Sequence, residues 1–229
     1  MSTSLNYNGQ TINGVLFDLD GTLLDTASDL GAAANALLAR DSLPLLSDDT
    51  IYHTASQGAL ALIKAGYGND LDEMRYQQLR QQFLLSYQQN IANHTRYFES
   101  VEHCLSQLDQ HGIVWGIVTN KPTLYTEQLL EHFPRLANCA ITVCGDTLPV
   151  CKPNPDPLLL AAKALALAPE EIAYVGDART DIEAAQHAHM VSIAASYGYI
   201  PRHDPCVAWH SDLIIDRCKD LFSVLSKSV

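Results

Sequence analysis

Residues 17–25 read Phe-Asp-Leu-Asp-Gly-Thr-Leu-Leu-Asp and continue an apolar run that begins at Val15. The two carboxylates at positions i and i+2, Asp18 and Asp20, leave a strand on the same side. One can attack a substrate while the other donates a proton to the departing oxygen. Gly21 allows a sharp turn that brings backbone N–H groups near an anion. Acidic pairs often only cap a helix, but this pattern after a buried strand favours a catalytic role.

Five further apolar runs follow along the chain. They cover residues 113–118, 141–144, 172–175, 191–195 and 213–215. Such runs, without polar alternation, are typical of strands buried on both faces, as in parallel sheets. Helical periodicity separates them, at residues 101–111, 124–133, 157–167 and 182–189. The alternation predicts an α/β fold, a Rossmann-like open parallel sheet that binds ligands at the carboxyl ends of its strands.

One long segment, residues 26–93, contains no strand pattern, and its apolar residues repeat with helical period. We therefore predict a small all-helical cap domain at residues 26–93, inserted after the first strand. The α/β core domain is then made of residues 1–25 and 94–229. The Gln-rich stretch 77–89 is interpreted as a solvated helix face.

Three more polar clusters follow apolar runs or open helices. Thr119 and Asn120 could hold phosphate oxygens, although such residues also serve as ordinary helix caps. Lys152 precedes a helix and would place a point charge on a phosphate and on the nucleophile. Asp177 and Asp181 would begin the next helix, where carboxylates stabilise the helix dipole. They could equally supply hard oxygen ligands for Mg²⁺ together with Asp18.

These four clusters, in this order, resemble the motifs of the haloacid dehalogenase superfamily, and the resemblance covers essentially the whole chain. It implies a phosphatase in which Asp18 is the nucleophile, Asp20 the general acid/base and Lys152 a catalytic cation. Phosphate would contact Gly21, Thr119, Asn120 and Lys152. The resemblance also implies Mg²⁺ held by the Asp18 carboxylate, the Asp20 backbone carbonyl and Asp177. Asp181 would act mainly through a bound water and through Lys152.

Within the superfamily, the chain is similar to the phosphoglycolate phosphatase group, on residues 145–147, 155–158 and 197–199. A related branch, which acts on N-acetylmuramic acid 6-phosphate, is resembled by residues 115–122, 197–200 and Trp209. Both groups often carry an arginine where this chain has Tyr52 and His53, so a carboxylate on the substrate would need another cation. Lys64 is one candidate, but a solvated lysine is the favoured interpretation. The loop Ser56, Gln57 and Gly58 is expected to face the leaving group.

Other members of the superfamily fit less well. Its dehalogenases lack the second aspartate of the first motif, and phosphonate hydrolysis needs a cap lysine, for which Lys64 is the only candidate in the insertion. A sugar phosphomutase shares all four motifs and stays open. A binding protein that has lost turnover is disfavoured by the intact acidic residues.

Composition limits the partners. A net charge of −12 argues against binding to nucleic acid or to an anionic membrane, which needs a basic face. The expected partner is a small phosphorylated metabolite, because a metal ion and one lysine can reverse the local sign of charge. The six cysteines form no CxxC pair, and the polar first ten residues lack the features of a signal peptide. We therefore expect a cytoplasmic protein, and the oligomeric state stays open.

Overall fold

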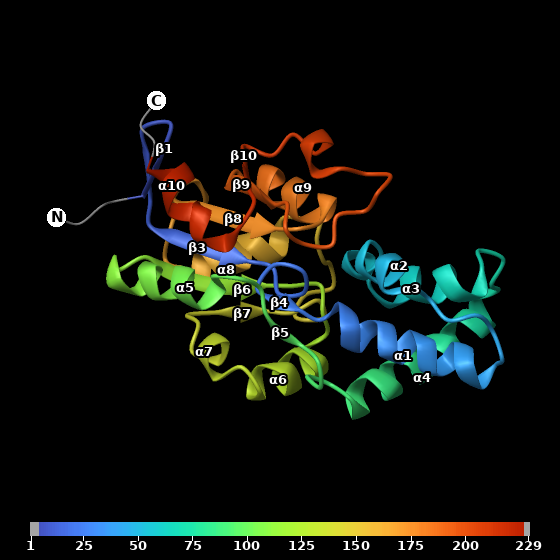
Figure 1. Ribbon diagram of the computed structural model, residues 1–229. Helices are drawn as coiled ribbons and strands as arrows, with labels where there is room; N and C mark the ends of the chain where they lie inside the picture. Colours follow the sequence, from blue (N-terminus) through green and yellow to red (C-terminus); the bar gives the residue numbers. More distant parts are fainter. Residues whose placement is uncertain (1–4, 227–229) are drawn as a thin grey trace.

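The computed structural model describes residues 5–226 (Figure 1). Its main sheet has six parallel strands in the order β10-β9-β8-β3-β6-β7. These strands are β3 (Gly14–Phe17), β6 (Val114–Val118), β7 (Thr142–Val143), β8 (Ile172–Gly176), β9 (Val191–Ala195) and β10 (Leu213–Ile215). The predicted open parallel sheet is confirmed, and the strand that precedes Asp18 lies at its centre.

Helices cover both faces of this sheet (Figure 1). Val15 and Phe17 of β3 point to the face covered by α5 and α6, whereas Leu16 points to the face covered by α8 and α9. The core helices are α5 (Val101–Gln110), α6 (Thr123–Glu131), α7 (Pro134–Ala137), α8 (Asp156–Leu165), α9 (Arg179–His187) and α10 (Leu221–Leu225). Both faces of β3 are therefore buried, which explains why its sequence shows no polar alternation.

Residues 26–93 contain helices and turns and no strand. The helices are α1 (Ala27–Arg40), α2 (Asp48–Tyr52), α3 (Gly58–Tyr67) and α4 (Glu73–Gln89), with the short 3₁₀ turn η1 (Ala55–Gln57) between α2 and α3. They bury an apolar cluster of their own, which includes Leu62 and Phe83. The predicted helical insertion is thus confirmed as a feature of the fold. We refer to residues 26–93 as the helical segment.

Two short strands, β4 (Leu24–Asp25) and β5 (Arg96–Tyr97), pair antiparallel where the chain leaves the sheet and returns to it. Asp29 of α1 is 1% exposed and accepts hydrogen bonds from the backbone N–H groups of His94 and Thr95 and from the Thr95 hydroxyl. The start of the helical segment is thereby tied to its end.

An N-terminal hairpin was not predicted from the sequence. Strands β1 (Leu5–Tyr7) and β2 (Gln10–Ile12) pair antiparallel around Asn8 and Gly9, both at positive φ. An Asn-Gly pair suits this two-residue turn because both positions need that conformation. Among residues 5–226, no helix is long and apolar enough to cross a membrane.

Candidate active site

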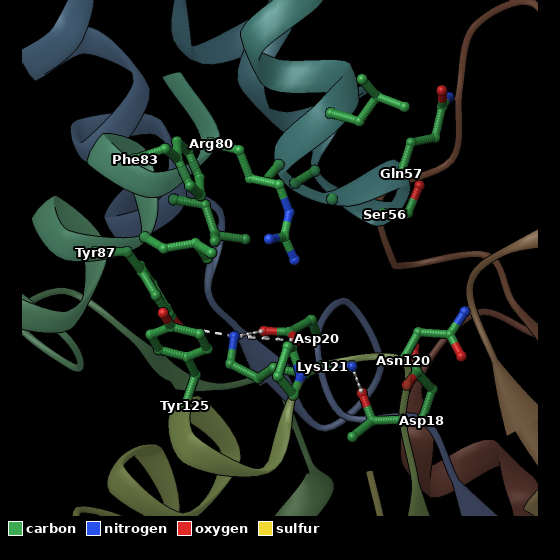
Figure 2. Close-up of a pocket in the computed structure, with 18 of the residues that line it drawn as sticks. Asp18, Asp20, Ser56, Gln57, Arg80, Phe83, Tyr87, Asn120, Lys121 and Tyr125 are labelled. Carbon is green, nitrogen blue, oxygen red and sulfur yellow. Dashed lines mark hydrogen bonds and ion pairs between the residues drawn. The ribbon is translucent and has the colours of Figure 1, made fainter. Parts of the chain in front are cut away.

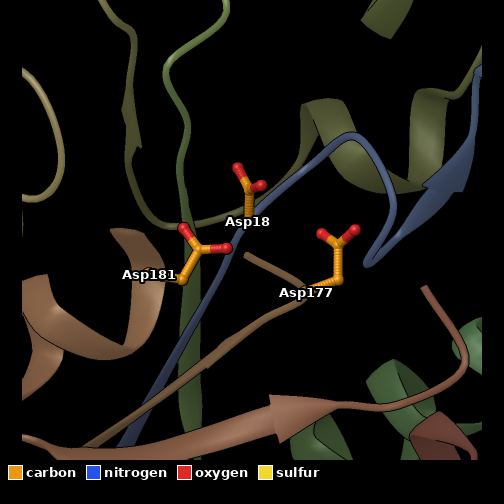
Figure 3. A group of neighbouring side chains, drawn as sticks. All are labelled: Asp18, Asp177 and Asp181. Carbon is orange, nitrogen blue, oxygen red and sulfur yellow. The ribbon is translucent and has the colours of Figure 1, made fainter. Parts of the chain in front are cut away.

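Three buried aspartates meet at the carboxyl edge of the sheet (Figure 3). Asp18 follows β3, Asp177 follows β8 and Asp181 lies in the first turn of α9. One carboxylate oxygen from each lies within 4.8 Å of the other two. Adjacent parallel strands end at the same edge, which is why residues far apart in sequence meet here.

Lys152 lies against this group of carboxylates. Its Nζ is 2.7 Å from Asp181 Oδ1 and 2.9 Å from Asp18 Oδ1. The ammonium also donates to the Val118 carbonyl at 3.0 Å and to the Tyr174 hydroxyl at 2.7 Å. Because Lys152 is only 3% exposed, these contacts hold its charge in one position.

Burial and the repulsion of neighbouring carboxylates disfavour the ionised forms of Asp18 and Asp177. Burial raises the pKa of Asp18 to about 6, with Lys152 opposing and Asp181 reinforcing the rise. Burial, followed by the charges of Asp18 and Asp181, raises the pKa of Asp177 well above its usual range. For Lys152, burial alone lowers the pKa, but the two neighbouring carboxylates outweigh it and the net direction is upward.

The donor set suits a hard divalent cation. Three carboxylates face a single lysine, so the pocket carries excess negative charge when all three are ionised. Mg²⁺ prefers carboxylate oxygens and keeps several waters, and it would relieve the carboxylate repulsion that adds to the effect of burial on the pKa of Asp177. The residues present therefore fit this ion.

The backbone around Gly21 closely approaches Asp177. Gly21 has a φ of +86°, and a Cβ placed there would lie 2.0 Å from Asp177 Oδ2. Thr22 donates from its hydroxyl to Asp177 Oδ1 at 3.1 Å, and the Tyr199 N–H donates to Asp177 Oδ2 at 2.9 Å. Only glycine fits this turn, which orients the aspartate.

Thr119 and Asn120 follow β6 at the same edge. Thr119 is buried, and its hydroxyl oxygen accepts from the Lys121 N–H at 3.2 Å. The Asn120 side-chain amide donates to the Lys152 carbonyl and accepts from the Lys152 N–H, both at 3.0 Å. The Asn120 amide thus fixes the loop that carries Lys152, a role that the sequence did not indicate.

Asp20 lies beside Asp18 and has a cationic partner that sequence reasoning missed. Lys121 Nζ is 3.0 Å from Asp20 Oδ1 and also donates to the Tyr87 hydroxyl at 2.9 Å. The Thr26 hydroxyl donates to the same Asp20 oxygen at 2.6 Å. Lys121 follows the Thr119-Asn120 pair directly, so its position next to a predicted motif was the available signal.

A cavity of about 330 Å³ separates this edge from the helical segment (Figure 2). Asp18, Asp20 and Lys121 lie at its floor, and Ser56, Gln57 and Gly58 belong to the opposite wall. The Ser56 hydroxyl donates to the Tyr199 carbonyl at 3.0 Å. Gln57 is exposed, and its side chain points away from Asp18 and Asp20. Lys64 is exposed and does not line this cavity.

Comparisons with known proteins agree with this geometry. The chain is 35% identical over 218 residues to an N-acetylmuramic acid 6-phosphate phosphatase of Pseudomonas aeruginosa, covering 95% of this chain and 96% of that protein. It is 38% identical over 208 residues to a phosphoglycolate phosphatase of Xanthomonas campestris pv. campestris, covering 91% and 94%.

Among solved structures, a predicted phosphoglycolate phosphatase from Haemophilus somnus matches with a TM-score of 0.82 and 29% identity, covering 93% of this chain and 97% of that one. The model of the haloacid dehalogenase-like hydrolases matches residues 15–195, which include all four predicted motifs. The chain therefore belongs to the haloacid dehalogenase-like hydrolase family.

Proposed function

We propose that the protein is a Mg²⁺-dependent phosphomonoesterase that hydrolyses a small phosphorylated metabolite through an aspartyl-phosphate on Asp18. The observation that carries this proposal is the buried group of Asp18, Asp177 and Asp181 in contact with Lys152. A network of ion pairs with a purely structural role would have as many cations as carboxylates. In this group, three carboxylates face one lysine. Excess buried acid at the mouth of a cavity is the expected preparation for a metal ion and a phosphate.

The reaction assigns one task to each side chain. Asp18 attacks phosphorus in line, forms an acyl phosphate and displaces the alcohol oxygen. Asp20 donates a proton to that oxygen and later takes one from the water that cleaves the acyl phosphate. Lys152 stabilises the charge on the phosphoryl oxygens. Asp18, the Asp20 carbonyl and Asp177 would hold Mg²⁺, and Asp181 would act through a bound water. The ion would neutralise the rest of the negative charge on the phosphoryl group.

Lys121 is a positioning residue in this scheme. With Thr26 it holds the Asp20 carboxylate at the floor of the cavity. The phosphate itself would be bound by Thr119, by Lys152 and by backbone N–H groups near Gly21 and Asn120. These groups contact only the phosphoryl part, so they do not distinguish one phosphomonoester from another.

Discrimination is assigned to the helical segment, which we propose acts as a lid domain. It contributes the wall of the cavity opposite Asp18 and Asp20, which includes residues 56–58, although the Gln57 side chain points away from those carboxylates. Closure would also exclude water from the acyl phosphate. The relatives make phosphoglycolate and N-acetylmuramic acid 6-phosphate the first candidate substrates.

Release of inorganic phosphate from p-nitrophenyl phosphate and from a panel of phosphorylated metabolites tests this proposal. Activity is expected with Mg²⁺, is expected to disappear with EDTA, and should return when Mg²⁺ is restored. The Asp18→Asn protein is the matched inactive control. Full activity in EDTA would contradict the metal assignment. Isomerisation without release of phosphate would favour a phosphomutase, and binding without turnover a non-catalytic protein.

A further inference from the structure

Arg80 of α4 is an unpaired cation in the wall of the active-site cavity. The protein has eight arginines, and each of the other seven has an aspartate partner within ion-pair distance. Within residues 5–226, Arg80 has neither an ion pair nor a hydrogen bond to its side chain. In a chain with 26 acidic residues, this makes Arg80 the exception.

The position of Arg80 on α4 points its side chain inward. Tyr76, Arg80, Phe83, Leu84 and Tyr87 all line the cavity, at the spacing of one helix face. The Arg80 guanidinium extends from this face into the cavity toward the floor that carries Asp20 (Figure 2). It therefore faces the space that a leaving group would occupy beyond the phosphate.

The two lysines near this space already form ion pairs with aspartates. Lys152 contacts Asp18 and Asp181, and Lys121 contacts Asp20. Arg80 thus offers one uncompensated positive charge, in a fork of donors that matches a carboxylate. A second phosphate, with up to two negative charges, would need more positive charge than Arg80 alone supplies. The geometry favours a single carboxylate.

The rest of the wall is largely apolar or aromatic, with Leu30, Phe83 and Tyr125 among its residues. Such side chains cover the body of a ligand, while a few placed polar groups orient it. The cavity volume of about 330 Å³ lies within the range of pockets that enclose ligands well above two carbons in size. A sugar acid suits this combination better than glycolate.

We propose that Arg80 binds a carboxylate on the leaving group, so that the site selects phosphomonoesters of acids, with a sugar acid phosphate preferred. This inference rests on the proposed phosphatase function. Arg80 would replace the arginine that related phosphatases often carry at the position of Tyr52 and His53. It lies on a different helix, α4.

The test uses two esters that differ only by the carboxylate-bearing group. N-acetylmuramic acid 6-phosphate carries a lactyl carboxylate, and N-acetylglucosamine 6-phosphate lacks the lactyl group. We expect the native protein to have the higher kcat/KM on the acid. Arg80→Gln should lower kcat/KM on the acid by about 10- to 100-fold, the usual range for losing a charged hydrogen-bonding partner, and the preference should collapse. Arg80→Lys should recover part of the preference, since it keeps the charge without the fork.

Arg75→Gln is the matched control, because Arg75 lies on the same helix but does not line this cavity. It should keep the preference. A binding readout uses the Asp18→Asn background, in which Arg80→Gln should weaken the calorimetric Kd for the acid ester and shift that for the neutral ester far less.

Equal losses on both esters, or no preference in the native protein, would overturn the role of Arg80. So would a larger loss on a sugar bisphosphate than on the acid, since Arg80 would then read a phosphate. If p-nitrophenyl phosphate is still hydrolysed in those cases, only the role of Arg80 fails and the phosphatase proposal stands. If that ester is not hydrolysed either, the phosphatase proposal fails, and the calorimetric comparison still decides whether Arg80 binds a carboxylate.

Discussion

At the scale of single residues, the active site concentrates charge that the fold must hold in place. Lys152 stabilises the ionised form of Asp18, whereas the nearby carboxylates of Asp181 and Asp20 destabilise it. Replacing Asp18 by Asn keeps the shape and removes the nucleophile. We expect Asp18→Asn to have no measurable turnover and a melting temperature at least as high as that of the native protein without metal. Appreciable kcat in this variant would exclude the proposed mechanism.

Lys152 is the second residue-scale test. Lys152→Ala should reduce kcat by roughly 10²- to 10³-fold, the usual cost of losing one transition-state donor. It also leaves Asp18 and Asp181 without their ammonium, so the metal-free protein should melt at a lower temperature. Lys163→Ala, at an exposed lysine of α8, is the control and should change neither quantity. Steady-state kinetics and thermal melting measure the two effects.

Some residues of the candidate site could be predicted from the sequence and others could not. Asp18, Thr119, Lys152 and Asp177 each stand beside a local signal, an apolar run or the opening of a helix, and the fold brings them together. Arg80 has no such signal: it lies in a Gln-rich helix that was interpreted as solvated. Its inward direction depends on how α4 packs, which is a tertiary property.

At the scale of elements, one carboxylate joins the two ends of the helical segment. Asp29 accepts hydrogen bonds from backbone and side-chain donors at residues 94 and 95. Asp29→Ala would leave these donors without their acceptor, at a cost of about 1–3 kcal/mol for each one that stays buried. We expect a clear loss of stability in urea unfolding. Asp70→Ala, at an exposed residue between α3 and α4, should stay within about 0.5 kcal/mol of the native protein.

Asp41 links three helices of the segment and gives a pH-dependent prediction. It contacts Arg40 of α1, Tyr67 of α3 and Arg75 of α4. Hydrogen bonds from Arg40 and Tyr67 lower the pKa of Asp41 to about 2 from its ordinary value of 3.8. A lowered folded-state pKa stabilises the fold above pH 4, and this stabilisation is lost as the pH falls through about 2.

Asp41→Asn should therefore lower the melting temperature at pH 7, and the difference from the native protein should shrink between pH 4 and pH 2. Circular dichroism melts across this range provide the measurement. Asp70→Asn serves as the control with no such trend. A difference that stays constant with pH would show that the Asp41 charge is not what joins the helices.

The elements themselves were largely predictable. Continuous apolar runs located β3, β6 and β8, and helical periodicity located α5, α6, α8 and α9. The N-terminal hairpin was missed although Asn8-Gly9 stood between two short alternating runs. Its strands have three residues each, too short for periodicity to register, so only the turn residues could have revealed it.

At the scale of the whole molecule, metal binding should control stability. The pKa values of Asp18 and Asp177 are raised in the folded state, so the folded protein holds protons that the unfolded chain releases. Without metal, stability should fall as the pH rises above about 4. Mg²⁺ at about 100 times its Kd should raise the melting temperature by on the order of 5–10 °C at pH 7 to 8.

Asp177→Asn provides the control for this effect. It removes one of the buried acids, so its metal-free stability should depend less on pH, and Mg²⁺ should raise its melting temperature less. Differential scanning calorimetry over pH 5 to 8, with EDTA or with Mg²⁺, compares the two proteins. Identical pH profiles would remove Asp177 from the metal site.

Tyr199 touches both halves of the molecule. Its N–H donates to Asp177, and its hydroxyl oxygen accepts from the Thr26 and Ala27 N–H groups at the start of α1. The Tyr199 backbone thus helps to orient Asp177, and the Tyr199 side chain holds the start of the helical segment. Because linkage is reciprocal, a phosphonate analogue that holds the lid closed should tighten Mg²⁺ binding by the same factor by which Mg²⁺ tightens the analogue. The protein would then respond to the two ligands jointly, as a coincidence detector that closes fully only when both are present, and Tyr199→Phe should weaken that cooperativity.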